Sequence, residues 1–211
     1  MDLSVLIDSW IPYLKQHQNF AYVALFFGSY FETVIGISFF VYGEFFFIIG
    51  GILAGMGVLN IGVVLLILFL GGMLGDFTSY FLGNKYGYKL YRKLEHVKYV
   101  NKYINEKNYN RGRAFFEKHG SKSIFLARLL GPIAWITPFL GGIYRLRLKS
   151  FLLFDILGVT VGIGQFVIAG YIFGINYERI LPIISEYLIV VLLGIASILF
   201  LYRFWRKPER Y

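Results

Sequence analysis

The sequence predicts an all-α, polytopic membrane protein with two oppositely oriented re-entrant hairpins and about three full spans, arranged like an inverted-repeat transporter. Composition gives the class, because 57% of the 211 residues are hydrophobic and 20% are aromatic, more than in an ordinary soluble domain. The lengths of the apolar runs give the hairpins. A membrane-crossing helix needs about 20 residues, and several runs are too short or too long for one simple crossing.

The basic residues indicate how the chain is oriented. The net charge is +9, and eleven of the 21 lysines and arginines fall within residues 85–122. Further basic residues follow at 145–149 and in the tail, 203–211. Basic loops stay on the cytoplasmic side, so all three regions are expected to be cytoplasmic parts of a multi-pass protein of the cell membrane. They adjoin apolar segments instead of forming a soluble basic domain, and nucleic acid is therefore not an expected partner.

The first quarter of the chain is interpreted as an interfacial helix, residues 1–19, followed by a re-entrant hairpin, residues 20–58. A single helix over residues 45–75 would be about 46 Å long, too long for a ~30 Å hydrocarbon core. Clustered glycines between 50 and 57, followed by Asn60, mark the break. In the rival topology residues 20–40 form a complete span and the N-terminus lies inside; hydropathy alone does not decide between the two.

The rest of the single membrane domain repeats this plan in the opposite sense. The run 123–144 is flanked by basic residues at both ends and broken at Gly131-Pro132 and Pro138, which predicts a second hairpin that opens to the cytoplasm. The basic segment before it is expected to be a helix on the anionic leaflet, with a solvated loop as the alternative. The remaining segments are a span over 60–84, the basic segment over 85–122, spans over 150–174 and 180–202, and a cytoplasmic tail over 203–211.

Ionisable residues inside the apolar segments are the candidate functional groups. Glu32 and Glu44 lie in the first hairpin and Arg128 in the second. A charge near the bilayer centre costs about 2.5–3.5 kcal/mol on insertion scales, so such residues commonly line a pathway. A guanidinium suits a phosphate, and burial favours the protonated carboxyl group, so the two glutamates are candidates for proton coupling. The alternative is a structural Glu–Arg pair that joins the hairpins.

Two aspartates and the glycine pattern leave further alternatives open. Asp76 is expected either to line the cavity or to have a capping or structural role, and Asp155 either to line the cavity or to pair with Lys149. Glycines four residues apart are expected to let helices approach closely. Neither a metal site nor a cofactor is expected. The glycine pairs are Gly51/Gly55, Gly71/Gly75, Gly83/Gly87, Gly158/Gly162 and Gly170/Gly174.

Over about residues 20–175, the order and spacing of several motifs resemble the DedA family, also called the VTT or SNARE-associated domain family. The resemblance implies a polytopic protein with two opposed hairpins that moves lipids across a bilayer. Bacterial members are implicated in returning undecaprenyl phosphate across the membrane and in homeostasis linked to the proton gradient; eukaryotic relatives are scramblases. The motifs are Glu32…Gly43-Glu44, Gly75-Asp76…Tyr80…Gly83…Gly87, Phe116…Gly120…Arg128…Gly131-Pro132…Pro138…Gly142 and Gly170-Tyr171…Gly174.

The resemblance also implies a set of site residues. The family uses two acidic residues twelve apart, which Glu32 and Glu44 match, and two arginines six apart, of which Arg128 matches the first. Ala134 stands at the second arginine position, so either Arg145 or its neighbour Arg147 substitutes, or the substrate is held differently.

The expected function is a flippase or scramblase for a phosphate-headed lipid such as undecaprenyl phosphate, coupled to protons, and not an enzyme. Its expected partners are anionic or polyprenyl-phosphate lipids, with a homo-oligomer left open. The alternative function is a proton- or ion-coupled transporter of a small solute.

Overall fold

The computed structural model describes residues 3–38, 40–94, 106–129, 136–180 and 197, without the side chains of 3–8, 91, 93, 94, 108, 128 and 129. Within these ranges the chain contains helices and turns but no strand, which confirms the all-α class. The helices are α1 (Leu3–Gln16), α2 (Gln18–Thr33), α3 (Gly43–Gly55), α4 (Ile61–Leu82), the π-helix η1 (Gly83–Gly87), α5 (Tyr88–Leu94), α6 (Glu106–His119), α7 (Lys122–Leu129), α8 (Thr137–Ile143) and α9 (Leu148–Ile175).

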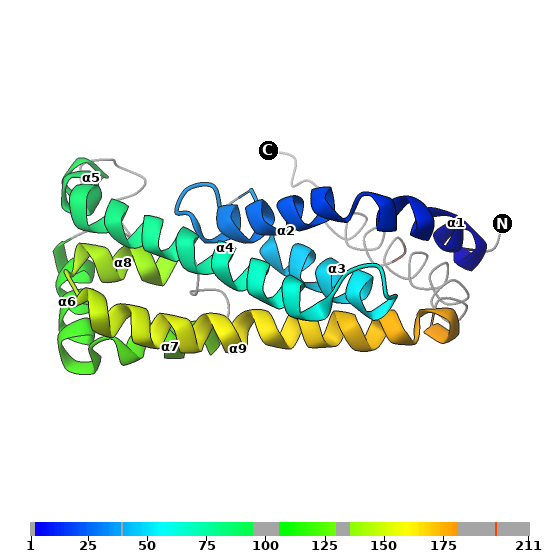
Figure 1. Cartoon of the computed structure of the whole chain (residues 1–211). Helices are drawn as coiled ribbons and strands as arrows, with labels where there is room; N and C mark the ends of the chain where they lie inside the picture. The colour runs from blue at the N-terminus through cyan, green and yellow to red at the C-terminus, as the bar shows by residue number, and fades with distance from the viewer. Residues whose placement is uncertain (1–2, 39, 95–105, 130–135, 181–196, 198–211) are drawn as a thin grey trace.

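Two long helices run side by side along the whole bundle (Figure 1). Ile61–Leu90, with 30 residues, and Leu148–Ile175, with 28, are long and apolar enough to cross a membrane. At 1.5 Å per residue they measure about 45 and 42 Å. Their outer faces carry exposed apolar side chains such as Leu66 and Leu157, as expected where hydrocarbon is the solvent. The third expected span, 180–202, lies almost entirely outside the described residues.

The first long helix begins at a well-formed cap and continues further than the sequence predicts. The Asn60 side chain accepts hydrogen bonds from the backbone N–H groups of Gly62 and Val63, at 2.9 and 3.2 Å. The span was expected to end at residue 84, but Gly83 keeps right-handed helical angles and opens η1. This π turn leads directly into α5, so a glycine expected to end the helix instead lies inside it.

Short helices pack in pairs against the long ones. In the first pair, α2 contacts α4 and α3 contacts α9; in the second, α7 contacts α9 and α8 contacts α4 and η1 (Figure 1). The segment 34–42 joins α2 to α3, and residues 130–135, between α7 and α8, lie outside the described part. The two pairs approach from opposite ends of the bundle. Their re-entrant placement in a bilayer stays a prediction.

The outer segments give the bundle its two ends. At one end, α1 precedes α2 with only His17 between them, and Trp10 and Tyr13 of α1 are exposed. At the other end, α5 and α6 supply the described part of the basic segment (Figure 1). The interfacial position of α1 and the leaflet-bound position of the basic segment stay predictions.

Two apolar clusters fill the interior at different heights along the long helices. The larger cluster includes Leu68 of α4 and Val159 of α9. The smaller cluster includes Tyr80 of α4 and Phe151 of α9. The stretch between them on each long helix carries a buried aspartate, which is where the candidate site begins.

Candidate functional site

The two glutamates of the first hairpin come together at its tip. Glu32 lies in the last turn of α2, and its carboxylate packs so closely on Gly43 that a Cβ there would overlap it. Glu44 is the next residue, in the first turn of α3, and its side chain is exposed, whereas Glu32 is half-buried. A helix N-terminus carries partial positive charge, so Glu44 lies where a negative charge is favoured, whereas the C-terminal turn of α2 offers Glu32 no such help.

Short polar side chains fix the tip against α4. Ser29 Oγ donates to the Leu68 carbonyl at 2.7 Å, and Thr33 Oγ1 donates to the Gly72 carbonyl at 3.2 Å. Ser79 Oγ donates in the other direction, to the Thr33 carbonyl at 2.7 Å, and accepts from the Ile35 N–H at 2.8 Å. These bonds satisfy backbone groups where α2 ends and set the height of Glu32 along α4.

Asp76 and Asp155 are completely buried, each at 0% exposure, on the two long helices. Lys149, the partner considered for Asp155, is exposed and forms no ion pair with it in the described part of the chain. The capping role considered for Asp76 is also absent, because the helix continues past it to Leu82 and beyond. Both aspartates therefore belong to the interior of the bundle.

Contacts on either side show that the two aspartates occupy facing positions. One turn before the first aspartate, a Cβ on Gly72 would lie 3.5 Å from Val159 Cγ1. One turn after it, the rings of Tyr80 and Phe151 have centroids 4.6 Å apart. In antiparallel helices, residues midway between two such contacts share one height, so Asp76 and Asp155 lie at one height on the facing sides of α4 and α9.

Glu32 reaches the same height from the first hairpin. Its neighbour Thr33 bonds to the Gly72 carbonyl and packs against Gly75, which immediately precedes Asp76. We call Glu32, Asp76 and Asp155 the acidic level. It separates the two apolar clusters and lies between the two pairs of short helices.

The backbone of residue 128 approaches the acidic level from the second hairpin. Arg128 lies one turn after Ile124 in α7, and Ile124 is completely buried in the cluster of Phe151. Because α7 packs along α9 in the same direction, position 128 has the height of Asp155, one turn beyond Phe151. The Arg128 side chain and Ala134 lie outside the described residues, so an ion pair between the hairpins stays a prediction.

Arg145 lies in a different place, at the basic end of the bundle. It follows α8 directly, has φ of 53°, and lines a pocket together with Tyr88, Tyr109, Arg113 and Tyr144. Arg147 is not one of the described residues that line this pocket. Of the two candidates for the missing second arginine, Arg145 lines this pocket and Arg147 does not, and the pocket is separate from the acidic level.

Sequence reasoning missed the polar residues that hold the acidic level in place. Ser29, Thr33 and Ser79 are buried yet were not singled out, because serine and threonine are common in membrane helices. Their spacing contained a signal: Ser29 and Thr33 are four apart on one face of α2. The tyrosines of the basic pocket were also missed, because they come from three separate segments.

Comparisons with known proteins agree on one family. The VTT domain matches residues 40–172. Protein DedA of Escherichia coli K12 is 25% identical over 208 residues, covering 94% of this chain and 90% of that protein. An uncharacterized membrane protein of Mycobacterium leprae is 32% identical over 156 residues, 74% of this chain and 66% of that one. A Synechocystis membrane protein is 28% identical over 195 residues, 90% and 86% of the two chains.

No solved structure matches the chain. The matched domain covers more than half of the residues, and the Mycobacterium leprae and Synechocystis relatives are named as membrane proteins. Together with the two long apolar helices, this places the chain in a membrane. The chain is a membrane protein of the DedA family, whose defining unit is the VTT domain.

Proposed function

We propose that this protein is a flippase or scramblase that carries a phosphate-headed lipid across the membrane. The acidic level is the observation that carries the proposal. It places ionisable groups deep inside an apolar bundle, at the height where the two pairs of short helices approach each other. Buried charges at such a height are costly and are characteristic of substrate or ion pathways.

A recurring glycine pattern supports a transporter-like arrangement in two halves. Gly71, Gly75, Gly83 and Gly87 of the first long helix recur 87 positions later, at Gly158, Gly162, Gly170 and Gly174 of the second. The contacts recur too. A Cβ on Gly83 would overlap a backbone carbonyl of α8, that of Phe139, and a Cβ on Gly170 would overlap a backbone carbonyl of α3, that of Ile48. An inverted repeat with re-entrant hairpins accounts for both recurrences.

Each charged residue has a role in this proposal. Arg128 binds the phosphate, because its planar fork of donors matches phosphate oxygens. Glu32 and Glu44 exchange protons or pair with Arg128 when no lipid is bound, and Asp76 and Asp155 line the path. Undecaprenyl phosphate is the cargo that the family resemblance indicates. The lipid leaves chemically unchanged, so no catalytic residue is assigned.

The test is lipid movement in reconstituted vesicles. Glu32→Gln, Glu44→Gln and Arg128→Ala should each lower the initial rate for a labelled phosphate-headed lipid by about tenfold or more, because each removes a charged contact. Matched controls are Glu106→Gln and Arg111→Gln, which remove the same charges from exposed positions on α6. Rates equal to wild type in all three site variants would reject the proposal.

The buried aspartates favour a second candidate, a proton- or ion-coupled transporter of a small solute. Carboxylates at facing positions of two helices are sufficient for cation coupling without any phosphate ligand. The two candidates differ in what moves. A solute-dependent current across vesicles that show no lipid movement would favour the solute transporter, and lipid movement without such a current would favour the flippase or scramblase.

A further inference from the structure

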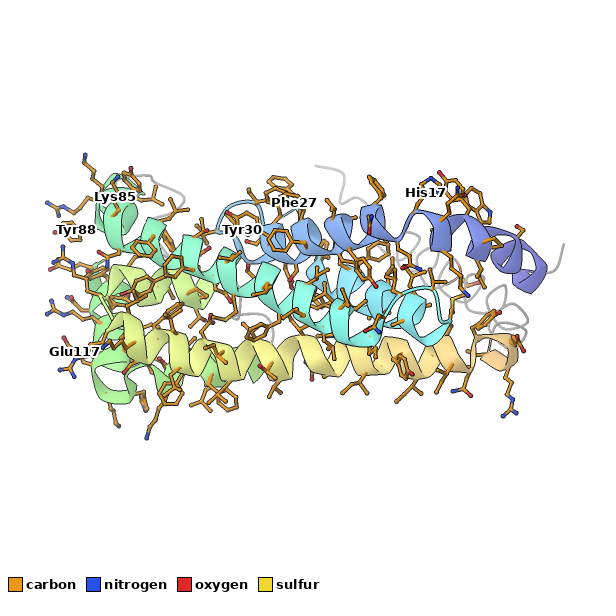
Figure 2. All side chains as sticks on the ribbon, in the orientation of Figure 1. His17, Phe27, Tyr30, Lys85, Tyr88 and Glu117 are labelled. Carbon is orange, nitrogen blue, oxygen red and sulfur yellow. The ribbon has the colours of Figure 1, made fainter. Side chains whose placement is uncertain are left out.

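A cavity lies at the basic end of the bundle, away from the acidic level. It has a volume of about 380 Å³ and lies between α6, the start of α5 and the turn from α8 to α9. Tyr88 and Glu117, two of its lining residues, are both found at this end (Figure 2). We call this cavity the tyrosine pocket. Its volume falls in the range of small-ligand sites.

Three tyrosine rings from three separate segments form its walls. The ring of Tyr109 lies 6.2 Å from that of Tyr88 and 5.4 Å from that of Tyr144. The Tyr144 hydroxyl donates to the Tyr109 carbonyl at 3.3 Å. Gly112 allows α6 to come this close, since a Cβ there would overlap the Tyr144 hydroxyl. The pocket is therefore shaped by specific packing between α6 and the end of the second hairpin.

Two arginines give the pocket its charge. Arg113 donates from Nε to Glu117 Oε1 at 2.8 Å, and this bond orients the guanidinium. In the described part of the chain it uses Nε–H alone, which leaves both Nη groups for a ligand. Arg145 supplies the second cation. With one carboxylate against two guanidinium groups, the pocket favours an anion.

The backbone at Arg145 is held in an uncommon conformation. Its φ of 53° is in the left-handed region, which residues other than glycine and asparagine rarely adopt. Hydrogen bonds from Arg145 N to the Gly142 carbonyl and from Leu146 N to the Gly141 carbonyl, both 3.0 Å, keep the turn in place. Such strained residues cluster at ligand sites.

We propose that the tyrosine pocket binds the phosphate group of a lipid headgroup in the adjoining leaflet. The pocket lies beside the ends of both candidate spans, near Leu90 and Leu148, where headgroups are found. Exposed apolar side chains on these two candidate spans, including Leu90 and Leu153, provide a surface for the lipid chains. The Tyr144 hydroxyl is neutral at physiological pH and adds no negative charge beside the bound anion.

In the proposed function this pocket is a loading site that precedes the acidic level. That role rests on the proposed function, whereas binding itself does not require translocation. The two can therefore fail separately: a protein that binds lipid phosphate at the pocket but moves no lipid would retain the pocket and lose the transporter.

The experiment is a titration of the purified full chain in detergent with dioleoyl phosphatidate, with binding followed by native mass spectrometry. Arg145→Asn and Arg113→Gln should each weaken binding by about tenfold, because each removes charged hydrogen bonds to phosphate. Asparagine is chosen at position 145 because it tolerates the left-handed region. Lys149→Gln and Arg111→Gln remove nearby exposed charges and should stay within about twofold of wild type.

A second arm separates lipid phosphate from free phosphate. Glycerol 3-phosphate and inorganic phosphate, added in large excess, should leave the lipid bound. Displacement at matched concentrations would instead identify a soluble phosphate ligand and overturn the lipid assignment. Equal binding by both pocket variants and both controls would overturn the site itself. Thermal unfolding of each variant is recorded, and if Arg145→Asn does not fold, the result of Arg113→Gln decides.

Discussion

Each pair of short helices has a first limb, α2 or α7, and a second limb, α3 or α8. The two second limbs contact the long helices in the same way. In the first pair, α3 lies so close to α9 that a Cβ on Gly51 would overlap the Val167 carbonyl. In the second pair, α8 lies equally close to α4, and a Cβ on Gly142 would overlap the Tyr80 carbonyl. Both contacts are backbone against backbone, which only glycine permits.

The first limbs of the two pairs differ. Gly75 of α4 is covered by α2, and a Cβ there would overlap both the Thr33 hydroxyl and the Tyr30 carbonyl. Its counterpart 87 positions later, Gly162 of α9, has no described atom within 4 Å. The limb α2 has 16 residues, whereas α7 has eight. The difference shows that a glycine pair in a membrane helix permits a close approach without requiring one.

The largest expected effect tests whether the two second limbs are equivalent. Gly51→Ala and Gly142→Ala should each lower the free energy of unfolding by about 3 kcal/mol, because each new methyl group meets a backbone carbonyl that cannot move aside. SDS titration in mixed micelles measures the loss. Gly164→Ala is the control, since no described atom lies within 4 Å of that position. A large loss at Gly51 and none at Gly142 would break the equivalence.

A smaller effect with opposite signs tests the difference between the first limbs. Gly75→Ala should cost about 2–3 kcal/mol, because the new methyl group would overlap the Tyr30 carbonyl as well as the Thr33 hydroxyl. Gly162→Ala should instead stabilise the protein by about 0.5–1 kcal/mol, because alanine favours a helix more than glycine does. The same SDS titration compares the two variants. Similar losses for both would mean that Gly162 is covered as Gly75 is.

The hydrogen bonds at the tip of the first pair give the next effect. Ser79→Ala removes a hydroxyl that serves both the Thr33 carbonyl and the Ile35 N–H, so the loss should be about 1–2 kcal/mol. Thr160→Ala removes a hydroxyl that bonds only within its own helix, to the Ile156 carbonyl, and should cost far less. If both variants unfold alike, the tip does not depend on Ser79.

The smallest effect concerns pH at the end of the second pair. Burial raises the pKa of Tyr144 from 10 to about 12, so the folded state keeps this phenol neutral at pH values where the unfolded state ionises it. The stability from Tyr144 is complete below pH 10 and is lost between pH 10 and 12. Tyr144 is only partly buried, so the change should be about 1 kcal/mol or less after solvent screening.

Comparing wild type with Tyr144→Phe isolates this contribution from other groups that titrate in alkali. The stability difference between the two proteins should shrink as pH rises from 9 to 12. Denaturation followed by circular dichroism at each pH provides the measurement. A difference that stays constant over this range would show that the phenol titrates equally in both states.

Much of the architecture could be predicted from the sequence. Apolar length predicted the two long helices, and clustered glycines predicted the break between α3 and α4, because both signals are local. The end of the first span could not be predicted: Gly83 lies within a continuing helix through η1. A glycine ends a helix only if its surroundings favour the left-handed conformation, and here α8 packs against Gly83 instead.

The sequence indicated the individual residues of the candidate site, but it did not indicate how the fold groups them. Charge in an apolar run identified Glu32, Asp76 and Asp155 individually. Their common height was not predictable, because it depends on helix register fixed by distant contacts such as Tyr80 with Phe151. Arg145 and Arg147 were the candidates for a substitute second arginine; Arg145 lines the tyrosine pocket, and its role as that substitute stays a prediction.

The sequence by itself therefore determined the membrane class and the identity of the buried charges, because these follow from composition and hydropathy, and its motifs carried the resemblance to the family. The tertiary structure alone decided which glycines carry a backbone contact, which carboxylates share a height, and that three tyrosines enclose a cavity with two arginines. The physical reason is that packing between helices distant in sequence sets their relative height and rotation. No local pattern in one helix encodes the position of its partner.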